Sequence, residues 1–201
     1  SVWNSLRLAV GGATICILLA SLISYITVKT KIAGRGILEG LTFIPWAFPG
    51  TALAIGLLWA YVNFPLPIYN TLWILMVAYI TRFLPYGLRA VSSTIIQIQN
   101  ELEEASVVCG AGFVATFRRI LLPLLRPSII GGWLLLATLF FREFGMSIFL
   151  YSPGAEPIGP VIYFLYEDLE FGAVGALGIL IPMVSMAIMV IGHKFAKARI
   201  V

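Results

Sequence analysis

The sequence has few charged residues and few of the side chains that hydrolytic or metal sites need. Only 11% of its 201 residues are charged, against about 25% in a typical soluble domain, so a water-soluble globule is excluded. Cys16 and Cys109 are its two cysteines, which excludes a disulfide scaffold. His193 is the sole histidine and Asp168 the sole aspartate, so we expect no metal site, no cofactor and no catalytic constellation.

The basic residues are also not gathered as a nucleic-acid-binding protein would need. The formal net charge is +4, but lysines and arginines stand between apolar runs rather than on one polar face. We therefore expect no nucleic-acid partner.

Apolar residues make up 60% of the sequence and fall into long runs. A helix needs roughly 20 apolar residues to cross the hydrocarbon core of a bilayer. The runs show none of the alternation that membrane β-strands require. The sequence thus predicts an all-α, polytopic membrane bundle with five transmembrane helices, over residues 8–28, 40–62, 71–88, 128–151 and 171–192.

The lysines and arginines between these spans predict the orientation in the membrane, because cytoplasmic loops retain positive charge. Three segments are basic: the connection after the first span, the loop 89–127 and the tail 193–201. The link 63–70 is uncharged. The loop 152–170 carries four acids and no base. We therefore expect a multi-pass protein of the inner (plasma) membrane, with the amino terminus of this segment outside and its carboxyl terminus in the cytoplasm.

Proline and glycine interrupt the second span in the run FIPWAFPG, which contains Pro45, Pro49 and Gly50. Proline inside a helix removes a backbone hydrogen bond. Broken helices at membrane depth occur where protein or a water-filled cavity receives the freed carbonyls, and they often mark a substrate path. Pro45 and Pro49 are therefore candidate path residues. The alternative is that proline is simply commoner in membrane helices than in soluble ones.

The basic inner loop predicts two short helices joined by a sharp turn. Asn100 and Glu103 have the spacing of a capping box at a helix start. Gly110 and Gly112 favour a turn, and a second helical stretch is expected to end before Pro123. Gly110 is expected to have backbone angles that favour glycine, or to be a closely packed glycine.

Apolar residues of this loop suggest that another protein covers it, since they are poorly suited to water. The alternative, an amphipathic helix lying flat on lipid, is disfavoured by Glu101, Glu103 and Glu104, because such helices have a basic polar face. The apolar residues are Val107, Val108, Phe113, Val114 and Phe117.

Seven residues of the loop reproduce the spacing EAA, three residues, G, nine residues, I, one residue, LP. This pattern resembles the signature loop of type I ABC importer permeases, and Ser106 stands where the family usually has alanine. The resemblance implies that residues 95–127 form a coupling loop that docks on a cytoplasmic ATPase dimer. The seven residues are Glu104, Ala105, Ser106, Gly110, Ile120, Leu122 and Pro123.

A finer resemblance concerns the cargo. Five runs of the sequence are similar to the carboxyl-terminal half of ferric iron permeases: RFLPYGLRAVS, ELEEAS, LPLLRP, FREF and LYSPG. The permeases for thiamine, polyamines and phosphonates have similar loops. The family implies one transmembrane domain over residues 1–201, a second permease half from the same or another chain, a periplasmic or extracellular substrate-binding protein and a lipid bilayer. Because the sequence begins at Ser1 without methionine, we expect it to be part of a longer permease.

The sequence contains no G-x-x-x-x-G-K-[ST] run, so we do not expect it to bind ATP phosphates itself. It is predicted to be a transport subunit and not an enzyme. The alternatives are an ATPase-independent channel, a secondary carrier or an intramembrane enzyme. A purely structural subunit would leave the charges inside the membrane unexplained.

Three charged residues fall within predicted spans, where ionisable groups are costly and often functional. Arg82 lies near the middle of the third span and Arg142 in the outer part of the fourth. Glu143 is expected to neutralise an arginine across the bundle, with Arg82 as one candidate, and so to help gate the path. In the alternative, Arg142 extends toward the membrane surface and Glu143 fixes helix packing. Contact between Glu143 and a hard ferric cargo, which prefers oxygen ligands, is a third interpretation.

Overall fold

A computed structural model describes residues 1–63 and 70–197, with side chains up to residue 192. Most of the link predicted at 63–70 and the last four residues of the tail lie outside this part. The regular elements in it are all helical, which confirms the predicted fold class. They are α1 (Val2–Arg7), η1 (Leu8–Gly12), α2 (Ala13–Lys29), α3 (Arg35–Phe43), η2 (Ile44–Ala47), α4 (Gly50–Asn63), α5 (Leu72–Gln97), α6 (Asn100–Val108), α7 (Phe113–Thr116), η3 (Phe117–Leu121), α8 (Leu122–Phe141), α9 (Ser147–Leu150), α10 (Ile158–Glu167) and α11 (Phe171–Lys197).

Four continuous helices in the described residues are long and apolar enough to cross a membrane. A fifth crossing would require α3, η2 and α4 together, which bend by 107°. The predicted count of five therefore holds only if this bent pair is one span. The four helices are Val2–Lys29, Leu72–Gln97, Phe113–Phe141 and Phe171–Gly192.

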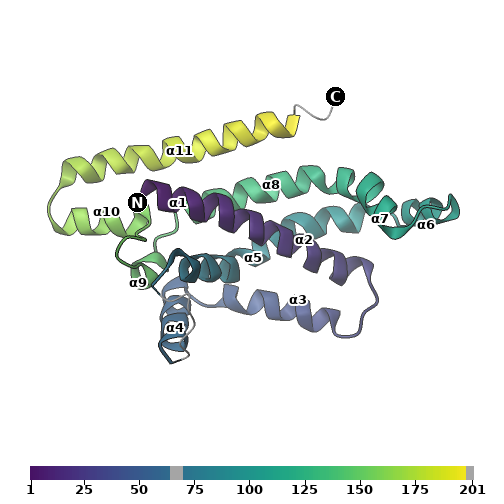
Figure 1. The fold of residues 1–201 in the computed structure, drawn as a ribbon, viewed down its shortest axis with the longest axis horizontal. Helices are drawn as coiled ribbons and strands as arrows, with labels where there is room; N and C mark the ends of the chain where they lie inside the picture. The colour runs from purple at the N-terminus through teal and green to yellow at the C-terminus, as the bar shows by residue number, and fades with distance from the viewer. Residues whose placement is uncertain (64–69, 198–201) are drawn as a thin grey trace.

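The predicted second span is broken because of its prolines. Phe48 has extended backbone angles (φ −93°, ψ 144°), as expected for a residue that precedes a proline, here Pro49. Pro45 stands in the first turn of η2, a single 3₁₀ turn. The chain then resumes as α4, which lies across the long axis of the molecule in Figure 1. The interruption predicted at FIPWAFPG is therefore present, and the chain turns through 107° there.

The predicted fourth span was placed too far along the chain. Pro123 does not end a helix: it lies in the first turn of α8, and the helix runs on from α7 through the π-helical turn η3. In a π-helical turn each N–H bonds to the carbonyl five residues back instead of four. This shift in the hydrogen bonds before Pro123 lets the helix continue although proline has no N–H to donate. The helix ends at Phe141, so Arg142 and Glu143 follow the span and do not lie inside it.

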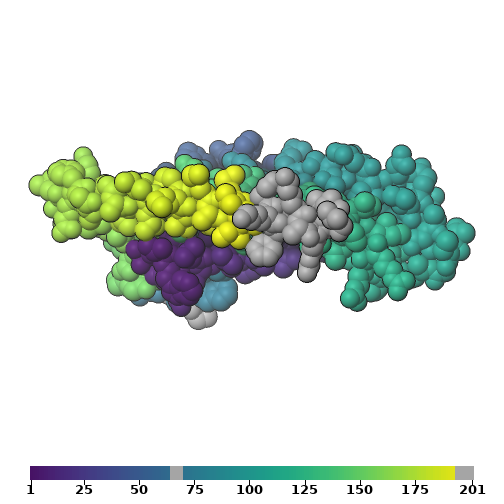
Figure 2. All heavy atoms as spheres, turned by 90° about the horizontal axis from the view of Figure 1, so that it is seen from above, coloured from purple at the N-terminus to yellow at the C-terminus, as the bar shows by residue number. Residues whose placement is uncertain are grey.

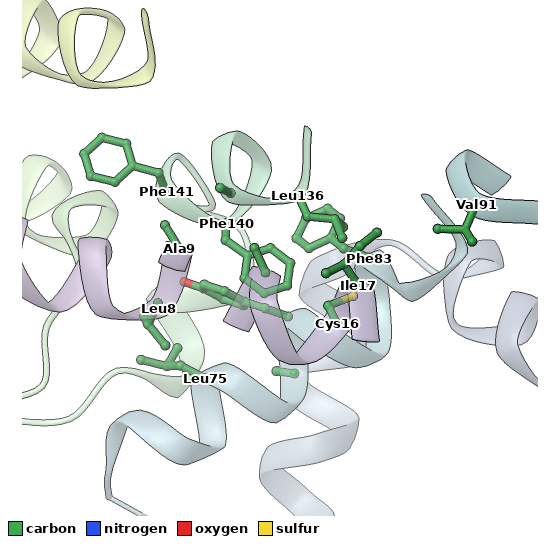
Figure 3. Close-up of a cluster of buried hydrophobic side chains, with 14 of the residues drawn as sticks. Leu8, Ala9, Cys16, Ile17, Leu75, Phe83, Val91, Leu136, Phe140 and Phe141 are labelled. Atoms are coloured by element: carbon green, nitrogen blue, oxygen red, sulfur yellow. The ribbon is translucent and has the colours of Figure 1, made fainter. Parts of the chain in front are cut away.

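The core of the bundle is formed by α2, α5 and α8. Figure 3 shows side chains from these helices meeting, among them Ile17, Phe83 and Phe140. The rings of Phe83 and Phe140 have centroids 5.5 Å apart. A Cβ added at Gly12 would lie 2.5 Å from the Phe140 ring, so a small residue is required where the first span meets α8, as is common between membrane helices.

Two surfaces of the bundle are apolar and exposed. In the candidate span of α11, Phe171–Gly192, no residue is buried, although α11 passes along α8 across one side of the molecule (Figures 1 and 2). Large apolar side chains are also exposed on α3 and α4, including Trp59 and Ile37. Surfaces of this kind face lipid or another protein.

The segment between α8 and α11 contains two short helices. The residues of α9 had been assigned to the end of the predicted fourth span, and α10 lies in the acidic loop 152–170, where no helix was expected. Both are too short to register as spans. The segment is bonded to the start of the first span: Ile158 donates its backbone N–H to Ser5 Oγ at 2.8 Å, and Asn4 donates to the Glu156 carbonyl at 3.3 Å. Hydrogen bonds from its own backbone N–H and from that of Gly154 hold the pKa of Glu156 below its usual value.

Candidate functional site

The predicted coupling loop is a helix–turn–helix of α6, residues 109–112 and α7, which lies at one end of the molecule in Figures 1 and 2. The turn closes through backbone hydrogen bonds from Gly110 to the Val107 carbonyl (2.9 Å) and from Ala111 to the Ser106 carbonyl (3.0 Å). Gly110 has φ +82°, and nothing lies within 4 Å of a Cβ built there. Backbone conformation, and not close packing, is therefore the reason for glycine at this position.

The start of α6 differs from the predicted capping box. Gln99 is the N-cap residue and its side chain makes no cap hydrogen bond. Asn100 and Glu103 instead bind Lys29, at the end of α2: Lys29 Nζ lies 2.8 Å from Asn100 Oδ1 and 2.9 Å from Glu103 Oε1. Lys29 also donates to the Ile98 carbonyl. The side chains predicted to cap α6 thus attach it to the first span.

A second contact joins α6 to α7. Ser106 Oγ and Thr116 Oγ1 lie 2.9 Å apart, and Thr116 is buried. An alanine at 106, as is usual in the resembled motif, could not make this bond. The departure of Ser106 from the motif was visible in the sequence, but its partner was not.

The apolar residues of this helix–turn–helix are exposed, with one exception. Val108 is 87% exposed and Val114 75%, and Val107 and Phe113 are also exposed. Phe117 is the exception: it packs on the core, with its ring centroid 6.2 Å from that of Tyr25. Of the motif residues, Glu104, Ala105, Gly110, Leu122 and Pro123 are exposed, while Ser106 and Ile120 are half-buried.

The candidate path residues Arg82, Pro45 and Pro49 come together on one side of α5. Arg82 donates a hydrogen bond to the Phe48 carbonyl at 2.9 Å, within the broken span that Pro45 and Pro49 interrupt. A carbonyl freed by the break thus receives an arginine. Two turns along α5, Arg89 lies over the Phe43 ring, 4.8 Å from its centroid.

Glu143 does not pair with an arginine. Its carboxylate accepts hydrogen bonds from the backbone N–H groups of Met146 (2.9 Å) and Ser147 (3.1 Å) and from Ser147 Oγ (3.0 Å). It therefore holds the first turn of α9, as an acceptor at a helix start does. Among the described side chains, residues 1–63 and 70–192, the one ion pair within 4.0 Å is Lys29 with Glu103, so the expected pair of Glu143 with Arg82 is not formed. Arg142 is exposed.

The described residues contain no group of three or more His, Cys, Asp or Glu side chains that could hold a metal ion. The site consists instead of a projecting helix–turn–helix and an arginine-bearing face beside a broken span. With the apolar bundle, these features define a polytopic membrane protein of the transport-permease class.

Comparison with known proteins gives the family. The family described as "Binding-protein-dependent transport system inner membrane component" matches residues 12–200. The chain belongs to this family, and so to the multi-pass proteins of the inner membrane.

Relatives by sequence are named as transport system permease proteins. The chain is 30% identical over 191 residues to the ferric transport system permease protein FbpB of Actinobacillus pleuropneumoniae, covering 94% of this chain but 27% of that protein. It is 27% identical over 196 residues to the spermidine/putrescine permease PotC of Escherichia coli K12, covering 98% and 74%. A putative 2-aminoethylphosphonate permease, PhnV of Salmonella paratyphi A, is 26% identical, covering 77% and 58%.

Solved structures share the fold. The methionine ABC transporter MetNI matches with a TM-score of 0.78 at 18% identity, over 98% of this chain and 93% of that one. A bacterial ABC transporter for alginate import matches with a TM-score of 0.79 at 19% identity, over 100% and 79%.

Proposed function

We propose that this chain forms one half of the translocation path of an ABC importer, driven by a separate ATPase. The observation that carries the proposal is the helix–turn–helix α6–α7, which exposes Val107, Val108, Phe113 and Val114 at one end of the bundle. Exposed apolar residues on a projecting element fit a protein–protein contact. The chain has no phosphate-binding loop of its own, so ATP hydrolysis belongs to the partner.

In the proposed arrangement the loop within residues 95–127 lies in the cytoplasm and transmits closure of an ATPase dimer. Glu104, Ala105, Ser106 and Gly110 are the contact residues on α6 and its turn, and Ile120, Leu122 and Pro123 fix the passage into α8. A substrate-binding protein docks outside, and a second permease half completes the path. Residues 1–201 form a single transmembrane domain, with the amino terminus outside and the carboxyl terminus inside. The basic inner loops support this orientation.

Ferric iron is the first cargo to test, because FbpB is a ferric permease at 30% identity. Polyamines and phosphonates are the competing cargoes, since permeases named for them are 27% and 26% identical, and thiamine is a further one. An ATPase-independent channel or secondary carrier is the alternative of a different class.

Co-purification tests the coupling proposal. The full-length permease is expected to retain a P-loop ATPase, and Val108→Arg is expected to lose at least nine-tenths of it, because a charge would be buried in the contact. Glu101→Gln, on the same helix, is the matched control and is expected to retain it. Retention by V108R, or ATP-independent uptake by the wild type, would contradict the proposal.

A further inference from the structure

A cavity of about 550 Å³ lies between the broken span and the core helices. Phe43 and Trp46 line it from α3 and η2, and Leu135 contributes from α8. Tyr86 and Arg89 line it from α5. This volume is within the range of pockets that hold small-molecule ligands.

The polar groups that line the cavity are hydrogen-bond donors. Trp46 Nε1 donates to the Tyr86 hydroxyl at 3.1 Å, so the Tyr86 O–H proton is left to donate elsewhere. Arg89 contributes a guanidinium whose Cζ lies 4.8 Å from the Phe43 ring centroid, and a cation–π contact of this kind uses none of its N–H donors. Two donors, one of them positive, thus border an otherwise apolar cavity.

The positive charge of this side of α5 is not balanced by carboxylates. Arg82, Tyr86 and Arg89 are spaced by four and three residues, so they share one helix face. In the part of the chain that the structure describes, neither arginine has a carboxylate within 4.0 Å. Arg82 is held by the Phe48 carbonyl, and Glu143 is committed to the start of α9.

We propose that this cavity is a cargo subsite for a small molecule bearing an oxyanion, such as a phosphonate or the carboxylates of a ferric chelate. The inference rests on the proposed function and specifies its cargo class. Arg89 supplies charge and two parallel N–H donors, a geometry that suits phosphonate and carboxylate oxygens. The Tyr86 hydroxyl supplies a third donor. A free polyamine, which carries only positive charge, is repelled by Arg82 and Arg89.

Equilibrium binding to the full-length permease in lipid nanodiscs tests the proposal without the binding protein, whose own affinity would dominate uptake. The probes are radiolabelled 2-aminoethylphosphonate, ferric citrate and spermidine. The structure predicts that at least one of the two anions binds, that spermidine does not displace it, and that Arg89→Gln weakens binding at least tenfold. The anion that binds more tightly identifies the source of the oxyanion.

Two variants keep the test independent of folding. Arg7→Gln is the matched control, because Arg7 also lies over an aromatic ring, 5.2 Å from the centroid of Trp3, but away from the cavity. Anion binding by R7Q should stay within twofold of wild type. Tyr86→Phe removes one donor and keeps the ring, with an expected weakening of about threefold to tenfold.

Three results would overturn the inference. They are displacement of the anion by spermidine, unchanged anion binding by R89Q, and no binding of either anion at millimolar concentration. None of these results depends on the ATPase. If the ATPase co-purifies and drives uptake of spermidine, the proposed function stands and the cargo subsite fails. If no ATPase is retained, the proposed function fails, whatever the binding data show.

Discussion

At the residue scale, Gly110 is the position where backbone conformation most restricts the side chain. Its φ of +82° costs a residue with a Cβ about 1–2 kcal/mol, and a β-branched side chain suffers more. We expect Gly110→Val to insert normally but to reduce ATPase co-purification at least tenfold, as measured on purified membranes.

Gly112 provides the control for Gly110. It lies in the same turn and is equally open to solvent, but its φ is −75°, which any residue adopts. Gly112→Ala should therefore retain the ATPase. Loss of the ATPase in G112A as well would show that bulk at the interface, and not backbone conformation, is decisive.

Glu143 is predicted to act on stability and not on gating. Its carboxylate binds the first N–H groups of α9, and loss of such an acceptor costs about 0.5–2 kcal/mol. Glu143→Ala is expected to lower the melting temperature of the purified protein by a few degrees, with near-normal uptake per folded molecule. Glu170→Gln, at an exposed position, should leave the melting temperature unchanged. Normal stability with abolished uptake in E143A would restore a role in the path.

At the element scale, Lys29 and Glu103 attach the coupling helix α6 to the first span. Their side chains are 5% and 24% exposed, and removing one member of a largely buried pair costs about 3–5 kcal/mol. Lys29→Met and Glu103→Gln should each increase amide hydrogen exchange in α6 and weaken coupling. In a double-mutant cycle the two effects should be clearly less than additive; simple additivity would show that the pair contributes no coupling energy.

Some of these helices could be predicted from the sequence and others could not. Apolar length and glycine are local signals, so α2, α5, α11 and the turn at Gly110 could be located from the sequence. The fourth span could not be placed correctly, since a proline in a first helical turn and a proline that ends a helix look alike in sequence. The spacing of Asn100 and Glu103 predicts a local cap, although their partner, Lys29, lies 71 and 74 residues away. Tertiary partners of this kind cannot be derived from spacing.

The candidate site was likewise only partly predictable. The motif residues could be identified by spacing, and Arg82 by its position within an apolar run. The contacts of Arg82 with Phe48 and of Arg89 with Phe43 depend on the 107° bend between α3 and α4, which two prolines indicate but do not specify.

At the scale of the whole molecule, the orientation across the membrane is the property most open to direct test. Lys31 follows α2, and Asp168 follows α10 at the opposite end of the bundle, and both are exposed. In a Cys109→Ser background, which removes the exposed native thiol, Lys31→Cys should react with an impermeant thiol reagent only from the cytoplasm. Asp168→Cys should react only from outside.

The buried Cys16 supplies an internal control for that labelling experiment. The Cys16 thiol is buried, so the reagent cannot reach it in the folded protein. The C109S parent should therefore remain unlabelled until it is denatured. Labelling of K31C and D168C from the same side would contradict the topology.

The bonds between the first span and the acidic segment also set an order of events during synthesis. Ser5 and Ile158 are 153 residues apart, and a ribosome adding about 5–20 residues per second needs roughly 8–30 s to make the chain between them. During this interval the Ser5 hydroxyl, buried in the finished protein, lacks its native partner. Completion of α9 and α10 therefore locks the first span in place, so a helix made early in this segment is among the last to reach its final contacts.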